Sequence, residues 1–454
     1  MFYVVFFVVV YRIGVAIFRN YCWGGCDFPY MDVFAFMEIR KTKNMPNYIA
    51  LLIPVFLLLI AIEWWFSVKR NDEMYEGSNT VMNMAIGAVD QFGALLYLFG
   101  LFVCLKFSQT HFQVYALPKD WRQWVLAFVF VDLVAYWYHR CSHRINFLWA
   151  GHVTHHSSKY FNLSNGFRTS PFQGLFRIPF WMVLPVLGFD PLVLVITFKV
   201  VGLHDFFVHT SYIPKLGWLE YVIVTPSHHR VHHGKNDIYI DKNYGSALII
   251  WDRMFGTYQE ETEPVEYGLV SDYEDKNPVH AIFYHFKYLF SSILQIRGWG
   301  DKIRMLFMPP GWVPAGGLAM KSEDVVGLGE NLSDDDGIYA HQMPWALYLL
   351  ISGIFGFVVT LYIYKSMPVV AAAFSFVLWI GNIVQASYLI GGRIYRYFGL
   401  IESSRLLVFS ILGYWILWPL GIWGQMAVAM VLLALLYRLV FVRRKSTETC
   451  MREA

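Results

Sequence analysis

Two long apolar runs, residues 47–66 and 84–107, restrict the fold of this chain more than any other feature. A helix rises about 1.5 Å per residue, so each run is long enough to cross the ~30 Å hydrocarbon core of a bilayer. Only 15% of the 454 residues are charged and 57% are hydrophobic. Soluble domains average about 25% charged and about 45–50% apolar residues. We therefore expect an integral membrane protein.

Further apolar segments predict a polytopic, all-α helical bundle. A third span covers 122–138, and prolines interrupt the apolar stretch 172–203, which indicates a helical hairpin that dips into the bilayer. The region 45–310 contains these segments, and a Gly-, Pro- and Asp-rich linker follows it at 311–343. The C-terminal transmembrane region 344–442 holds four apolar segments, near 344–364, 368–390, 404–424 and 426–442, and a basic tail follows at 443–454.

The chain's ends and its basic residues bear on orientation. Residues 1–30 lack a basic start and a clear cleavage site, so they do not read as a signal peptide. They are either an extra membrane anchor or an extension of the gene model. The second alternative arises because Met31 is itself a plausible translation start. Lys and Arg gather near the histidine motifs and at the C-terminus, so that face is expected to be cytosolic. Glu63 is expected at the membrane interface; a buried carboxylate near the site is the alternative.

Eleven of the 15 histidines lie between His139 and His233, in spacings that bring imidazoles together. On a helix, positions i, i+3 and i+4 adjoin, so each of three helical turns should present its histidines on one face. A structural zinc needs four ligands and a catalytic zinc usually three, so eight imidazoles predict two metal ions. Neutral imidazole suits iron, zinc, copper and nickel. The eight are His139, His143, His152, His155, His156, His229, His232 and His233.

Four other polar residues are candidates for supporting these ligands: Asp132, His228, Asp237 and Asp241. Asp132 lies two helical turns before His139, where it would either orient a ligand imidazole or serve helix packing. Asp237 and Asp241 follow the last histidine cluster, and they either brace it or belong to a solvated loop.

The motifs HRCSH, HVTHH and HRVHH resemble the histidine signature of the fatty acid hydroxylase superfamily, which includes sterol desaturases. Flanking words extend the resemblance to its alkylglycerol monooxygenase branch, and the similarity covers roughly residues 45–310. These words are Trp149–His152, Asn162–Ser164, Thr225–Gly234, Asp241–Tyr244 and Ile249–Thr257. Members often carry a further His after the hairpin, which makes His209 a ninth candidate ligand; His204 is expected to serve packing.

The resemblance implies a membrane-bound, non-haem oxygenase with two iron ions, for which zinc can substitute. It also implies a membrane lipid substrate, O2, and an external electron donor, which in this branch is tetrahydrobiopterin. The target would be the carbon next to the ether oxygen of a 1-O-alkylglycerol, which yields a fatty aldehyde and glycerol. The membrane would be the endoplasmic reticulum in a eukaryote and the inner membrane in a bacterium. Arg144 and Lys159 depart from the branch pattern and leave the exact substrate open.

Other functions stay open at this point. The chain could hydroxylate or desaturate a sterol, a fatty acid or a carotenoid. Outside the enzymes, the histidines could bind or transport zinc, although a transporter should place its ligands near mid-membrane on discontinuous helices. Net charge is only +3 without a basic patch, so no nucleic acid partner is expected. The sequence does not indicate the oligomeric state.

Overall fold

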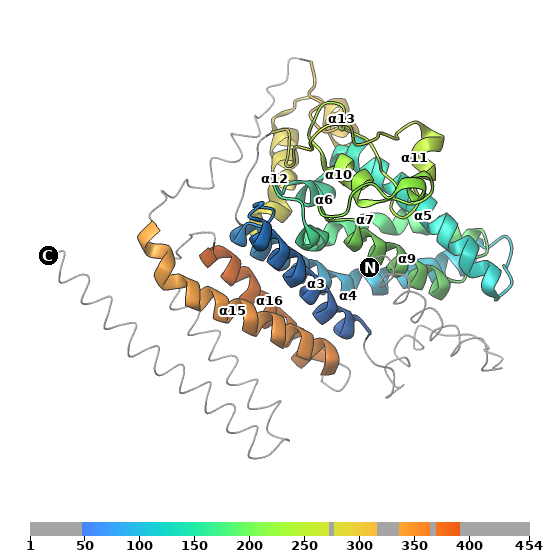
Figure 1. Cartoon of the computed structure of the whole chain (residues 1–454). Helices are drawn as coiled ribbons and strands as arrows, with labels where there is room; N and C mark the ends of the chain where they lie inside the picture. Colours follow the sequence, from blue (N-terminus) through green and yellow to red (C-terminus); the bar gives the residue numbers. More distant parts are fainter. Residues whose placement is uncertain (1–47, 272–276, 316–335, 364–368, 391–454) are drawn as a thin grey trace. The chain divides into compact units, whose positions relative to one another are not determined.

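The computed structural model describes residues 48–271, 277–315, 336–363 and 369–390 (Figure 1). These residues form helices and loops; no strand is present among them, only two isolated bridges, Ile223 with Leu248 and Gly234 with Tyr267. The expectation of an all-α fold is confirmed for this part of the chain. The chain divides into two compact units after Asp334.

Helices α3 (Tyr48–Arg70) and α4 (Gly77–Phe112) cover the first two expected spans. Among the described helices, these two are long and apolar enough to cross a membrane. The third expected span, 122–138, is helical within α5 (Trp121–Arg144), but α5 does not meet the same criterion.

The expected hairpin at 172–203 is present as α7 (Pro171–Trp181), α8 (Val183–Val186) and α9 (Pro191–Phe207). Proline at the first turn and a side-chain cap start α7 and α9, because a proline there loses no helical hydrogen bond. The hairpin turns at Gly188, whose φ of 102° favours glycine. Buried apolar residues of α4, α5, α7, α8 and α9 form the main core, among them Tyr97, Val131 and Leu194.

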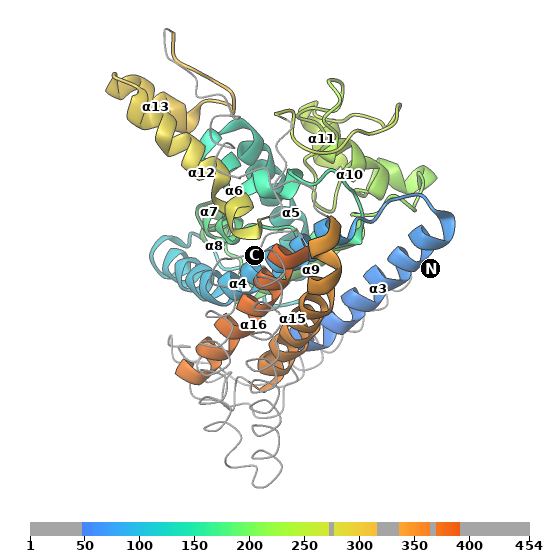
Figure 2. The same cartoon turned by 90° about the vertical axis from the view of Figure 1, so that its left-hand side faces the viewer.

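Shorter elements complete the first unit (Figure 2). They are α6 (Asn146–His156), η1 (Leu163–Phe167), η2 (Gly217–Tyr221), α10 (Pro226–His233), α11 (Ile250–Phe255), α12 (Pro278–Gln295) and α13 (Trp299–Phe307). Helix α6 packs between α5 and α12, and α12 also packs against α4. The second unit holds α15 (Asp336–Ile363) and α16 (Val369–Ile390), which pack on each other.

Glu63 is buried in the protein, which agrees with the alternative of a buried carboxylate. Its side chain is 4% exposed, and it accepts hydrogen bonds from the Tyr75 hydroxyl at 2.5 Å, the Leu163 amide at 2.7 Å and the Thr210 hydroxyl. A carboxylate can be buried when its lone pairs are satisfied in this way. Glu63 thereby ties α3 to the two segments that carry Leu163 and Thr210.

The expected linker is partly helical, because α15 begins at Asp336, inside 311–343. Residues 1–30, the segments 404–424 and 426–442, and the tail 443–454 lie outside the described residues. Small residues serve the contact between α15 and α16. A Cβ on Gly356 would meet the Trp379 ring at 2.2 Å, and Asn382 donates to the Ser352 hydroxyl.

Close packing of α7 on α4 yields the first prediction. A Cβ on Gly174 would lie 2.3 Å from the ring of Tyr97, whereas one on Gly202 in α9 would meet nothing within 4 Å. Gly174→Ala should cost about 1–3 kcal/mol of stability through overpacking. Gly202→Ala should stabilise by about 0.5–1 kcal/mol. Thermal unfolding of the full chain in one detergent measures both, and equal midpoints for the two variants would contradict this packing.

Candidate metal centre

Each histidine motif lies on a helix, as its spacing predicted. His139 and His143 are in the last turns of α5, and HVTHH ends α6. Helix α10 consists of the last motif with Pro226 at its first position. His209 follows α9 directly. The structure thus brings four separate segments together at one place.

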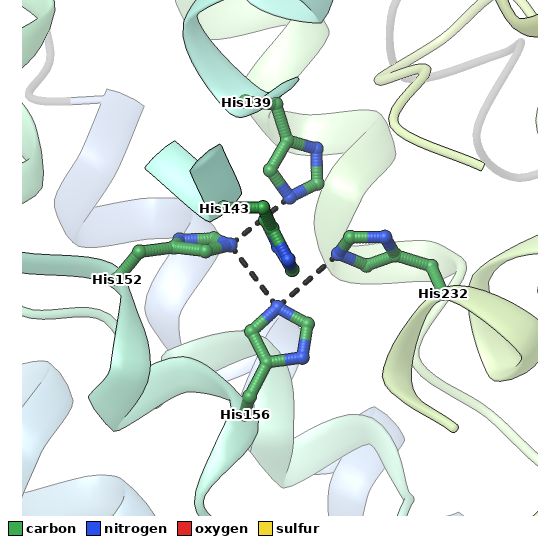
Figure 3. Close-up of side chains that lie close together, drawn as sticks. All are labelled: His139, His143, His152, His156 and His232. Atoms are coloured by element: carbon green, nitrogen blue, oxygen red, sulfur yellow. Dashed lines mark hydrogen bonds between the residues drawn. The ribbon is translucent and has the colours of Figure 1, made fainter. Parts of the chain in front are cut away.

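Five imidazoles form the first cluster, here called the five-histidine group: His139, His143, His152, His156 and His232. Their candidate ligand atoms all lie within 4.8 Å of one another. Figure 3 shows the rings pointing toward a common centre from α5, α6 and α10. The Nε2 atom of His152 is 3.0 Å from that of His139 and 3.1 Å from that of His156.

A second cluster, here called the four-histidine group, consists of His155, His209, His229 and His233, with the same 4.8 Å limit between ligand atoms. The Nε2 atom of His209 lies 3.0 Å from that of His229 and 3.3 Å from that of His155. All nine candidate ligands are therefore brought together, but in two sets. His155 and His156 belong to different sets, so the expectation that each motif uses one face is wrong in this detail.

Hydrogen bonds at the outer ring nitrogens show which nitrogen faces each centre. The Nδ1 atoms of His155 and His209 lie 3.2 and 2.5 Å from the carbonyl oxygens of Arg168 and Asp205. A carbonyl only accepts, so each Nδ1 carries the proton and each Nε2 presents a lone pair. Two lone pairs at 3.3 Å cannot form a hydrogen bond, whereas a cation between them would satisfy both. This donor set fits a metal ion, because protein-bound metals take neutral imidazole this way.

Burial keeps these ligands neutral. It holds the pKa of the imidazoles of α6 and α10 well below the ordinary value of histidine, and neighbouring imidazoles lower it further. Neutral imidazole is the form that binds metals, so the site needs no deprotonation before an ion enters.

One loop, residues 242–248, supports imidazoles through alternate carbonyls, and we call it the carbonyl loop. Lys242 O lies 2.9 Å from Nδ1 of His232, and Tyr244 O lies 2.8 Å from Nδ1 of His139. Ser246 O accepts from His204, which supports the expected packing role of that residue. The loop fixes the ring orientation of a ligand from α5 and one from α10.

Two buried carboxylates hold the carbonyl loop from outside. Asp132 accepts from the amides of Ala247 and Leu248, and from the Trp251 indole. Among the described residues it is not seen to bond to a ligand imidazole, so it supports the site through this loop. Asp252 accepts from the amides of Tyr244 and Gly245 at 2.7 Å each. Asp252 could not be recognised from the sequence, except that it lies in the segment Ile249–Thr257 that resembles the family.

Asp241 does contact a candidate ligand. One of its oxygens lies 3.6 Å from Nδ1 of His143, and the other accepts from Arg144 at 2.6 Å. Although burial raises it, contacts with His143 and Arg144 hold the pKa of Asp241 below its ordinary value. Asp241 thus leaves Nε2 of His143 for the centre, which agrees with the bracing role considered for it.

The other two supporting candidates lie elsewhere. His228 points its Nδ1 at the Thr225 amide, 3.2 Å away, so it caps α10 and faces away from the ligand groups. Asp237 is exposed, and no contact with either group is found for it among the described residues. A supporting residue that the sequence did not reveal is Arg168, which is buried. It donates to Thr154 O at 2.9 Å, while its own carbonyl accepts from His155.

A cavity of ≈ 540 Å³ opens beside the five-histidine group. His143, His156 and His232 form one wall, and His233 of the other group also reaches it. Apolar residues such as Trp149 line much of the rest. The volume lies within the usual range for small-molecule sites, about 300–1,000 Å³. Substrates can therefore approach the first group more directly than the second.

The support of the carbonyl loop generates a prediction. Asp252→Asn replaces an acceptor of the loop amides with an amide group, so the His139 ring loses its fixed orientation. Metal affinity should fall by about tenfold, as for other residues that orient ligands. Asp237→Asn, on the exposed neighbouring loop, is the control and should bind metal as the parent does. Metal titration monitors both, and an unchanged affinity at an unchanged unfolding midpoint would count against this role.

Comparisons with known proteins agree with this geometry. Residues 124–257 match the family model of fatty acid hydroxylases. Alkylglycerol monooxygenase of Danio rerio is 35% identical over 280 residues, which are 61% of this chain and 62% of the relative. The human enzyme of that name is 33% identical over 63% of this chain and 65% of its own length. The Xenopus tropicalis enzyme is 30% identical over 73% of each chain.

The match thus spans less than two thirds of the first two relatives, and no solved structure matches the chain. The family match covers α5 to α11 with all nine clustered histidines, and the Xenopus match extends well beyond it. On these grounds the chain belongs to the fatty acid hydroxylase family.

Proposed function

We propose that this chain is a membrane-bound, non-haem di-iron monooxygenase that hydroxylates a C–H bond of a lipid. The observation that carries the proposal is the pair of converging imidazole groups beside a partly apolar cavity. Two apolar helices and the family indicate a membrane protein, which supports a lipid as substrate. The names of the three relatives favour a 1-O-alkylglycerol as that lipid.

Each histidine group would hold one ion, five imidazoles for the first and four for the second. Iron bound there would supply the activation of O2 and the oxidation of an unactivated C–H bond. The protein supplies position and ligand orientation. The carbonyls of Arg168, Lys242 and Tyr244 fix three ligand rings, and the buried, neutral surroundings limit water.

The products follow from the position of the attacked carbon. Hydroxylation next to the ether oxygen gives a hemiacetal, which separates into a fatty aldehyde and glycerol. The second oxygen atom leaves as water, so the reaction consumes O2, two electrons and two protons. We propose an external electron donor, tetrahydrobiopterin by resemblance. The proposal also includes further membrane spans and a site on the cytosolic face. The membrane would be the endoplasmic reticulum in a eukaryote or the inner membrane in a bacterium.

Metal content tests the two-ion centre. The parent should bind about two ions per chain. His143→Ala and His209→Ala should each weaken the affinity for one of these ions, because each removes a ligand of a different group. His111→Ala, an exposed histidine on α4, is the control and should keep both ions. Elemental analysis of reconstituted protein measures the ratio, and a single ion in the parent would refute the di-metal proposal.

Turnover tests the reaction. Iron-loaded protein with tetrahydrobiopterin should consume O2 and release fatty aldehyde from a 1-O-alkylglycerol, and His155→Ala should do neither. If O2 were consumed with a sterol, a fatty acid or a carotenoid but not with the alkylglycerol, the substrate would be that lipid, and the chain would still be an oxygenase of the same family. Two bound zinc ions without O2 consumption, after iron loading as well, would favour a zinc-binding protein.

The cavity generates a separate prediction. Val270 lines it with a largely exposed side chain, so Val270→Trp should narrow it at little cost to folding. KM for the lipid should rise about tenfold or more, because a bulky side chain displaces part of the substrate. Metal content should stay at the parent level. Val114→Trp, at an exposed position outside the cavity, is the control; equal KM values for both variants would show that the lipid does not use this cavity.

A further inference from the structure

Helices α12 and α13 carry large apolar side chains on their outer surfaces, here called the interfacial stripe. Leu294 is 80% and Trp299 78% exposed. The exposed apolar residues are seven and four positions apart in α12 and four positions apart in α13, so those of each helix share one face. Contiguous exposed apolar surface of this kind marks a binding surface for protein or membrane. The stripe consists of Phe283, Phe290, Leu294, Trp299, Ile303 and Phe307.

The opposite face of α12 lines the cavity. Tyr284, His285 and Tyr288 contribute to its wall, as does the loop Pro309–Gly311 that follows α13. Buried residues of the same face pack on α6 and α4. Helix α12 therefore separates the stripe from the cavity by the thickness of one helix.

The contact between α12 and α4 places the first turn of α12 near the start of α4. Ala281 and Ile282 pack against Met82 and Ile86, where the apolar run of α4 begins. Helix α3 ends at Arg70, before the short connection 71–76 that leads into α4. Trp64 and Trp65 are exposed in its last two turns. Tryptophans gather at the boundary between hydrocarbon and headgroups, so α12 begins close to this boundary.

The charges around the stripe also fit a lipid surface. Lys302 Nζ lies 5.0 Å from the centre of the Trp299 ring, while Lys287 and Arg297 are exposed nearby. Arg304 pairs with Asp301 at 3.2 Å, which leaves the local charge positive. Amphipathic helices that lie in the headgroup layer combine Trp, Phe and Leu on one face with Lys and Arg beside it.

We infer that α12 and α13 lie in the headgroup layer of the bilayer, with the interfacial stripe embedded, and that lipids enter the cavity beside them. The occupant of the stripe is the membrane that α3 and α4 cross. The entry of a lipid substrate rests on the proposed function, whereas the membrane contact does not. A lipid taken up here would reach the five-histidine group without passing through water.

Nitroxide labels on the full chain test the contact. A ketone-bearing amino acid at Ile303, and separately at Arg304 outside the stripe, takes a label without changing the five cysteines. In nanodiscs of phosphatidylcholine and phosphatidylserine, O2 should relax the label at 303 more than a water-soluble nickel chelate does. The order should reverse at 304. Dominant nickel relaxation at 303 would overturn the inference, and so would protection from both agents, which would indicate a covering protein surface.

A variant tests entry. Trp299→Ser, Ile303→Ser and Phe307→Ser together should raise KM severalfold for alkylglycerol presented in vesicles, with kcat and metal content unchanged. Trp218→Ser removes an equally exposed tryptophan elsewhere and should leave KM unchanged. A parent-like KM in the triple variant would overturn the portal. Absence of turnover in every variant would count against the proposed function, and the relaxation data would still decide the membrane contact.

Discussion

Nine neutral imidazoles whose lone pairs converge on two centres are the constraint on which the rest of the structure depends. Lone pairs of neighbouring rings cannot bond to one another, so the rings must be held from behind or by a cation. Backbone carbonyls do the first, as at Asp205 and Arg168. A buried carbonyl is itself fixed only if its chain is fixed. Much of the structure around the site therefore consists of polar contacts that hold loops rather than ligands.

Most of the buried carboxylates near the site bond to the segments that support the ligands and not to the ligand imidazoles. The carboxylates of Asp132 and Asp252 bond to the carbonyl loop, and Glu63 bonds to segments that precede or follow ligand residues. Among the described residues, Asp241 is the carboxylate seen to approach a clustered imidazole. Two divalent ions would thus meet almost wholly neutral ligands. Their positive charge would be little compensated, and it would act on whatever occupies the cavity beside them.

The sequence could predict which histidines lie close together, but not which of the two groups each one joins. Spacings of three and four predicted helices for all three motifs, and α5, α6 and α10 have them. Adjacent positions such as His155 and His156 point about 100° apart around the axis. Whether that angle joins or separates them depends on where the other helices stand, which is tertiary information. The same limit explains Asp132, whose partners lie more than a hundred residues later.

The division follows a rule once both helices are seen. His152 and His156 of α6 enter the five-histidine group, and His155 enters the other. In α10 the roles reverse, because His229 and His233 enter the four-histidine group while His232 crosses over.

Each centre thus receives a pair four residues apart from one helix and a single ring from the other. Three rings per centre come from this exchange. The remaining rings come from other segments. His139 and His143 of α5 complete the five-histidine group, and His209, two residues after the end of α9, completes the four-histidine group. The inequality of the two centres therefore originates in the flanking helices, and the HxxHH motifs themselves are used equally. Because α5 adds His143 with Asp241 beside the cavity, the richer centre also contributes more imidazoles to the cavity wall.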